Sequence, residues 1–165
     1  MKNQITIKYL TRGALIAALY VAITYLCAML GLASGAIQFR VSEALCILPA
    51  FMPEATVGLF IGCMIANLVT GSTIIDIVLG SLATLIGAIG ARMLRKVRYK
   101  WLLGVPTVLA NALIVPISIL YSATNTLTLT GFFPIALSVA VGEIVCACIL
   151  GTLLYRTLER GRLFS

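Results

Sequence analysis

Six stretches of almost uninterrupted apolar residues dominate this 165-residue sequence. They cover residues 11–31, 41–52, 54–69, 74–91, 101–121 and 132–155. Hydrophobic residues make up 61% of the chain, charged residues make up 10%, and the mean hydropathy is +1.12. Because these values lie far outside the range of soluble domains, the sequence predicts an all-α integral membrane protein.

The second and third stretches are short for a membrane crossing, which takes about 20 helical residues. They flank Met52 and Pro53, where we expect a turn that lies shallow in the membrane. The alternative is one long, kinked helix over residues 41–69. That helix would give five crossings instead of six and would put the two termini on opposite sides of the membrane.

The basic residues decide between these alternatives. All twelve except Arg40 fall in three clusters, which lie at the start of the chain up to the first residues of the first stretch, between the fourth stretch and the fifth, and after the sixth. The members are Lys2, Lys8 and Arg12; Arg92, Arg95, Lys96, Arg98 and Lys100; and Arg156, Arg160 and Arg162. Six crossings put all three clusters on one side, which the positive-inside rule makes cytoplasmic. We therefore expect a six-transmembrane-helix bundle with both termini in the cytoplasm, a single domain over residues 1–165, and a first helix that is retained rather than cleaved.

The residue types exclude or disfavour several functions. The sequence contains no histidine, which excludes serine-histidine hydrolysis and most metalloprotease chemistry. The net charge of +7 comes from clusters beside apolar stretches, where anionic lipid headgroups, not nucleic acid, are the expected counter-charge. The five cysteines lie in apolar stretches without a CxxC pair, so we interpret them as packing residues and expect no metal and no cofactor. They are Cys27, Cys46, Cys63, Cys146 and Cys148.

Small residues recur every four positions in three of the stretches, a pattern that lets transmembrane helices approach closely. The first stretch carries two parallel rows of this kind. One is Ala14, Ala18 and Ala22, here called the alanine row, and the other is Gly13 and Ala17. We expect the rows of the third and fourth stretches to pack inside the bundle. For the first stretch two interpretations stay open: both rows pack internally, or one is buried and the other faces a partner protein.

Polar residues occur at two depths of the predicted bundle. Five lie near its outer boundary: Gln38, Arg40, Glu43, Asn67 and Asp76. Asn111 lies in the middle of the fifth stretch, and Glu143 follows Phe132 by eleven residues, or roughly 16 Å along a helix. A carboxylate near the membrane centre costs about 2.5–3.5 kcal/mol. We therefore expect Glu143 to face a polar cavity or a partner rather than lipid.

These polar side chains either pair with one another or bind a ligand. The pairs would be Arg40 with Glu43, Asn67 with Asp76, and Asn111 with Glu143. Pairing does not neutralise the set, because three carboxylates share a single arginine, and full ionisation would leave the site about two charges short of neutrality. Either desolvation keeps a carboxylate protonated or a cationic ligand supplies the charge. We favour a ligand site, with Glu143 as the strongest candidate residue.

Three segments resemble one known family. They are IQFRVSEAL at residues 37–45, followed by Pro49; GCMIANL at residues 62–68; and DIVLGSLATL at residues 76–85. Together they resemble the QueT family, and the likeness covers nearly the whole chain. Members of that family are regarded as the substrate-binding S-components of energy-coupling factor (ECF) transporters for queuosine precursors. The alanine row is similar to the motif by which S-components dock on the transmembrane coupling subunit.

The resemblance implies an S-component of the bacterial cytoplasmic membrane that captures a 7-deazaguanine near the outer face. Energy would come from a separate module with one transmembrane coupling subunit and two ATPase subunits. This chain has no GxxxxGK[ST] phosphate loop of its own, and we do not expect it to be an enzyme. The docking residues would then be Ala14, Ala18 and Ala22.

The implied ligand suits an excess of carboxylates, because its guanine-like edge offers two N–H donors and an aminomethyl group adds a cation. We expect Glu143 to accept the guanine-like edge, and Asp76 or Glu43 to meet the ammonium. Arg40 binds the ring carbonyl or holds Glu43. The remaining expected contacts are Asn67, Asn111 and Gln38, which orient the ligand, and Phe39, which stacks on it or anchors the chain at the interface.

Other classes stay open from the sequence alone. A small cation channel or stand-alone carrier would line its path with the carboxylates and self-associate through the alanine row. An S-component for another vitamin would have the same architecture. A membrane enzyme would use Asp76 and Glu143 as acid and base, but no nucleophile, metal cluster or cofactor motif accompanies them in the sequence.

Overall fold

The computed structural model describes residues 2–32, 39–124, 126 and 128–161. These residues form helices with short connections, and no strand occurs among them, which confirms the predicted all-α fold. The helices in chain order are α1 (Lys2–Met29), η1 (Val41–Ala50), α2 (Glu54–Val69), α3 (Ile74–Met93), η2 (Lys100–Leu103), α4 (Val105–Thr124), α5 (Leu129–Glu143), η3 (Ile144–Leu150) and α6 (Gly151–Arg160). The helices η1 and η2 are 3-10 helices, and η3 is a π-helix.

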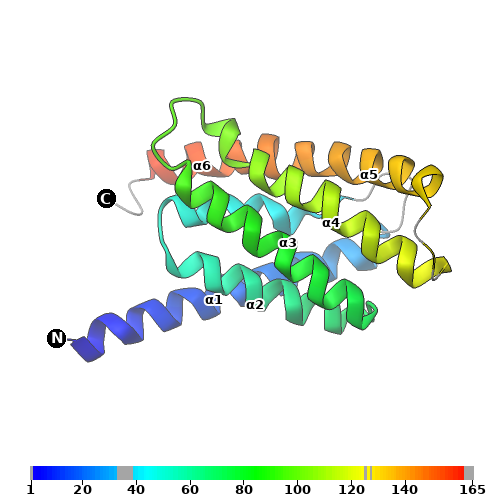
Figure 1. Cartoon of the computed structure of the whole chain (residues 1–165). Helices are drawn as coiled ribbons and strands as arrows, with labels where there is room; N and C mark the ends of the chain where they lie inside the picture. The colour runs from blue at the N-terminus through cyan, green and yellow to red at the C-terminus, as the bar shows by residue number, and fades with distance from the viewer. Residues whose placement is uncertain (1, 33–38, 125, 127, 162–165) are drawn as a thin grey trace.

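The described helices match the six predicted stretches. Four helical segments are long and apolar enough to cross a membrane: Ile7–Met29, Ile74–Met93, Lys100–Ala123 and Leu129–Arg160. The last of them runs continuously through α5, η3 and α6. The shorter apolar helices η1 and α2 are joined by a turn at residues 51–53 and run in opposite directions (Figure 1). The alternative of one kinked helix over residues 41–69 is therefore wrong.

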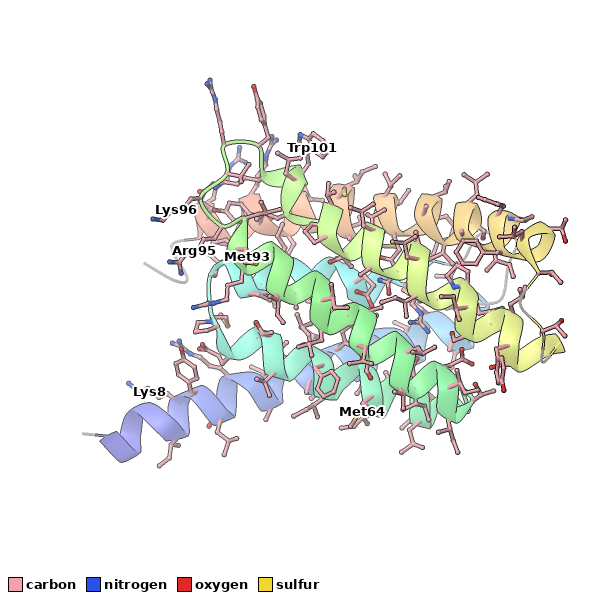
Figure 2. The ribbon with its side chains drawn as sticks, in the orientation of Figure 1. Lys8, Met64, Met93, Arg95, Lys96 and Trp101 are labelled. Atoms are coloured by element: carbon pink, nitrogen blue, oxygen red, sulfur yellow. The ribbon has the colours of Figure 1, made fainter. Side chains whose placement is uncertain are left out.

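The helix α1 begins, and α6 ends, at the same end of the bundle (Figure 1). The basic loop that joins α3 to η2 lies at that end too, as do Lys8, Arg95, Lys96 and Trp101 (Figure 2). This arrangement matches the predicted gathering of basic residues on one side of a membrane. That this side is cytoplasmic stays a prediction.

Glycine and alanine form both sides of the contact between α1 and α2. A Cβ atom on Gly58 would lie 2.5 Å from the carbonyl oxygen of Gly13, and one on Gly62 would lie 3.0 Å from the Cα atom of Ala17. The row of Gly13 and Ala17 therefore faces the bundle, whereas the three members of the alanine row are exposed. Of the two interpretations left open by the sequence, internal packing of both rows is therefore wrong; that the exposed row faces a partner protein stays a prediction.

The small residues of α3 pack against α4. A Cβ atom on Gly87 would lie 2.5 Å from Oγ1 of Thr107, and one on Gly90 would lie 2.3 Å from Cβ of Pro106. Ala83, on the preceding turn, is fully buried. Internal packing of these small residues is therefore confirmed.

The tight turn between α2 and α3 sets the positions of two predicted binding residues. Gly71 adopts a φ of 74°, a left-handed conformation that ends helices at little steric cost. The N–H of Ser72 then donates to the carbonyl oxygen of Asn67 at 2.9 Å. Thr73 caps α3 by accepting from the N–H of Asp76 at 3.3 Å. As a result Asn67 and Asp76 lie on facing helices next to the turn.

Candidate functional site

A polar cavity of about 280 Å³ lies between α1, α2, α3 and α4. It is near the turn that joins α2 to α3, and Figure 1 shows that this turn lies at the end of the bundle away from the basic loop. Its volume is near the lower limit of small-molecule sites, which span roughly 300–1,000 Å³. The lining residues are Thr24, Cys27, Ala28, Phe39, Arg40, Asn67, Thr70, Ser72, Asp76, Gly80, Val115, Ser118 and Ile119. The fold therefore brings together four of the predicted binding residues, namely Phe39, Arg40, Asn67 and Asp76.

Arg40, Asn67 and Asp76 form a connected polar group in this cavity. The Nη2 atom of Arg40 donates to Oδ1 of Asn67 at 3.2 Å, and Nδ2 of Asn67 donates to the backbone carbonyl oxygen of Asp76 at 3.4 Å. The Asp76 carboxylate accepts from Oγ1 of Thr73 at 2.7 Å and is partly exposed. The cavity thus presents a cation, an amide and an anion, which suits a ligand that carries both donors and acceptors.

Glu43 lies in the core rather than on the cavity wall. Its side chain is fully buried, and its Oε1 atom accepts hydrogen bonds from the Tyr20 hydroxyl and, at 3.1 Å, from the Thr84 hydroxyl. Its Oε2 atom accepts from the thiol of Cys46 at 3.0 Å. Among the described residues Glu43 makes no ion pair with Arg40, because the Arg40 side chain turns to Asn67 instead. The pairing of Arg40 with Glu43, one of the alternatives left open by the sequence, is therefore not found among the described residues.

Asn111 of α4 and Glu143 at the end of α5 are both buried. Both side-chain polar atoms of Asn111, and Oε2 of Glu143, make no hydrogen bond within the described part of the chain. The buried hydroxyl of Thr107, one helical turn before Asn111, also lacks a described partner. Each such group costs about 1–3 kcal/mol. Asn111 and Glu143 are neighbours, so these two favour a position for water or ligand, whereas the Thr107 hydroxyl lies near Gly87 of α3.

The two residues do not line the cavity itself. Val115, which does line it, lies four residues after Asn111, and so about 6 Å further along α4. Glu143 is followed directly by the π-helix η3, a rare type of turn that occurs frequently at functional sites. The structure thus places Asn111 on α4, a helix that bounds the cavity, and Glu143 on α5, which supplies none of the described lining residues; both lie deeper in the bundle.

Other residues differ from the predicted set in three ways: one is not described, some line the cavity without having been predicted, and one lies in the core. Gln38 lies outside the described residues. Thr24 and Ser118 also line the cavity, although they were not predicted from the sequence, where other hydroxyl residues in the same apolar stretches do not line it. Cys27 also lines it, whereas we had interpreted this residue only as packing. Cys63 does serve the core, where it accepts a hydrogen bond from Thr84 at 3.4 Å.

An apolar groove of about 970 Å³ lies between α1 and α2. It contains the whole alanine row and extends from Tyr9 and Pro53 at one end to Tyr25 and Val69 at the other. Small residues exposed along a groove of this kind let a transmembrane helix pack closely. The sequence predicted the row, but not that α2 would supply the second wall.

The fold and the cavity together define a helical membrane protein that can hold a small polar molecule near one end. The sequence matches the family described as QueT transporter over residues 10–160. The chain belongs to this family, which confirms the resemblance seen in its sequence motifs.

One relative is the "Queuosine precursor transporter QueT" of Lactococcus lactis subsp. cremoris (strain MG1363), which is 40% identical over 73 residues. The match covers 44% of this chain and 43% of the relative, so it spans less than half the length of that protein. No solved structure matches the chain.

Proposed function

We propose that the chain is the substrate-capture subunit of an ECF-type importer and that its ligand is a queuosine precursor of the 7-deazaguanine type. The observation that carries this proposal is the polar cavity that joins Arg40, Asn67 and Asp76 at the end of the bundle away from the basic loop. With the basic loop in the cytoplasm, this cavity faces outward, which is where an importer captures its substrate. The name of the Lactococcus relative supports the ligand class.

The charges of the cavity fit the proposed ligand. The ring carbonyl accepts from Arg40, and the ammonium of an aminomethyl form meets Asp76, whose carboxylate is partly exposed in the cavity. Asp76 suits this role better than Glu43, because core side chains donate to both oxygens of Glu43. Phe39 lines the cavity and stacks on the ring.

We assign the guanine-like edge to Glu143, with Asn111 setting its orientation. A carboxylate accepts two adjacent N–H donors in charge-assisted hydrogen bonds. The unpartnered polar atoms of both residues would gain partners when the ring passes Val115 and enters the deeper part of the bundle. The ligand then extends from Arg40 and Asp76 at the mouth to Glu143 at the base.

Isothermal titration of the detergent-purified chain tests the ligand assignment. The ligands are the aminomethyl and cyano 7-deazaguanine precursors, queuine and guanine. We expect tight binding of at least one deazaguanine and much weaker binding of guanine. Absence of binding in folded, monodisperse protein would reject the ligand class, and a cation current through the chain alone in a planar bilayer would favour a channel.

In the proposed cycle this chain binds substrate but does not hydrolyse ATP. Two ATPase subunits and one transmembrane coupling subunit would supply energy, and the chain would lie as a multi-pass protein in the bacterial cytoplasmic membrane. The exposed alanine row in the groove between α1 and α2 would be its docking surface for the coupling subunit.

Replacing Ala18 with leucine is expected to impair this assembly but spare ligand binding. The added side chain would project into the groove and hold a partner helix away. Co-purification of the tagged chain with the coupling subunit and both ATPases measures the effect. Ala123→Leu is the matched control, because it adds the same volume at an exposed position of α4 outside the groove. An intact complex with Ala18→Leu would exclude the alanine row as the docking surface.

A further inference from the structure

The apolar groove between α1 and α2 ends at a buried carboxylate with an unused oxygen. Glu54 opens α2 and is one of the residues that line the groove. Its side chain is 4% exposed, and its Oε1 atom accepts from Nη1 of Arg12 at 3.4 Å. Its Oε2 atom is buried and makes no hydrogen bond to any described residue. Oε2 of Glu54 therefore lacks a described donor at this end of the groove.

The ion pair with Arg12 is a weak partner for this carboxylate. It consists of a single long contact, and the Arg12 side chain is 57% exposed, so solvent screens the pair and the guanidinium can move away. A buried carboxylate is stabilised more strongly by a donor that stays out of water and satisfies the second oxygen. A donor from a partner can therefore replace Arg12 as the hydrogen-bond partner of Glu54.

The shape and charge of the groove indicate what kind of partner supplies the missing donor to Glu54. All described lining residues other than Glu54 are uncharged, and the exposed alanine row allows another backbone to come close. The wall formed by α2 is 16 residues long, or about 24 Å at 1.5 Å per residue, which suits a membrane-spanning helix. A lipid acyl chain would cover the apolar wall but would not need the close backbone approach that the exposed alanine row allows, and only a lipid with an amine headgroup would bring a donor to Glu54.

We propose that Glu54 is the polar anchor for a transmembrane helix of the coupling subunit, whose arginine or lysine side chain binds the carboxylate in place of Arg12. This inference rests on the proposed function. The apolar groove supplies contact area, and Glu54 sets the depth and direction of the docked helix, because a single cation near the membrane boundary satisfies it in one register only. Arg12 covers the carboxylate while the chain is alone.

The test compares Glu54→Gln with Arg12→Gln. Each variant is co-expressed with the coupling subunit and both ATPases of the ECF module from the same organism, and the dissociation constant is measured in nanodiscs. We expect Glu54→Gln to weaken assembly at least tenfold, and Arg12→Gln to leave it unchanged or tighten it. Titration with the deazaguanine that the wild-type chain binds should give the same affinity for both variants, which shows that they are folded. Glu54→Asp, which keeps the charge but shortens the side chain, should also weaken assembly.

Other outcomes would overturn the inference. Equal weakening by Glu54→Gln and Arg12→Gln would mean that the ion pair only holds α1 to α2. Assembly that is unchanged in Glu54→Gln but abolished in Ala18→Leu would support the alanine row as the docking surface. It would also show that Glu54 does not anchor the docked helix. Loss of a bound phosphatidylethanolamine, or of a dimer, from Glu54→Gln in native mass spectrometry would identify a different occupant. A wild-type chain that binds no coupling subunit would reject the proposed function itself.

Discussion

Replacing Glu143 with glutamine is expected to weaken deazaguanine binding by at least about 100-fold and to leave the helical bundle folded. The substitution keeps the shape of the side chain but removes its charge, and it turns an N–H₂ group toward the donors of the guanine-like edge. A hydrogen bond to a charged group contributes about 1.5–3 kcal/mol, and two are lost or weakened. Isothermal titration of the purified variant gives the affinity directly.

The matched control for this prediction is Glu159→Gln. Glu159 is an exposed carboxylate on α6, so its replacement makes the same chemical change at a surface position. We expect wild-type affinity for this variant. Wild-type affinity for Glu143→Gln as well would show that Glu143 does not contact the ligand, and the cavity residues Arg40 and Asp76 would then carry recognition alone.

Much of the architecture could be predicted because membrane insertion leaves few alternatives. A backbone surrounded by lipid must satisfy its own hydrogen bonds, so long apolar stretches become helices. The turn before α2 was signalled by Pro53, and the common side of the basic clusters by their spacing along the chain. The 3-10 geometry of η1 and the π-helix η3 could not be predicted, because they depend on packing rather than on local sequence.

The site was predicted in part, and the reason lies in sequence separation. Arg40, Asn67 and Asp76 were chosen because polar groups at membrane depth are costly, and the cavity joins them. The partners of Glu43 were missed, because Tyr20 and Thr84 lie 23 and 41 residues away along the chain. Nothing in the local sequence showed that two hydroxyls of apolar helices would satisfy that carboxylate.

The two small-residue rows of α1 show the same limit. Periodicity identifies a narrow helix face, but it does not say which helix lies against that face. The contact of Gly13 with Gly58 settles the question, since it buries one row and leaves the other exposed. A substitution at this contact should therefore lower the stability of the fold, and it should alter the groove only as a consequence.

Gly58→Ala is accordingly expected to destabilise the bundle markedly. The new Cβ atom would lie 2.5 Å from the carbonyl oxygen of Gly13, and a backbone atom cannot rotate away as a side chain can, so α1 and α2 must separate. Overpacking of this kind costs about 1–3 kcal/mol, which exceeds the gain of up to ~1 kcal/mol in helix propensity from glycine to alanine. The melting temperature of the detergent-purified chain should fall by several degrees.

Gly13→Ala makes the same chemical change on the opposite helix and should be tolerated. A Cβ atom there would lie 3.5 Å from the carbonyl oxygen of Glu54, which is an ordinary contact, so the propensity gain is retained. The pair therefore separates close helix contact from any general effect of replacing glycine. Equal melting temperatures for the two variants would mean that α1 and α2 are not held at this distance. A fall confined to Gly58→Ala would show that the close approach of α1 and α2 at Gly13 and Gly58 stabilises the fold on which the groove with Glu54 and the alanine row depends.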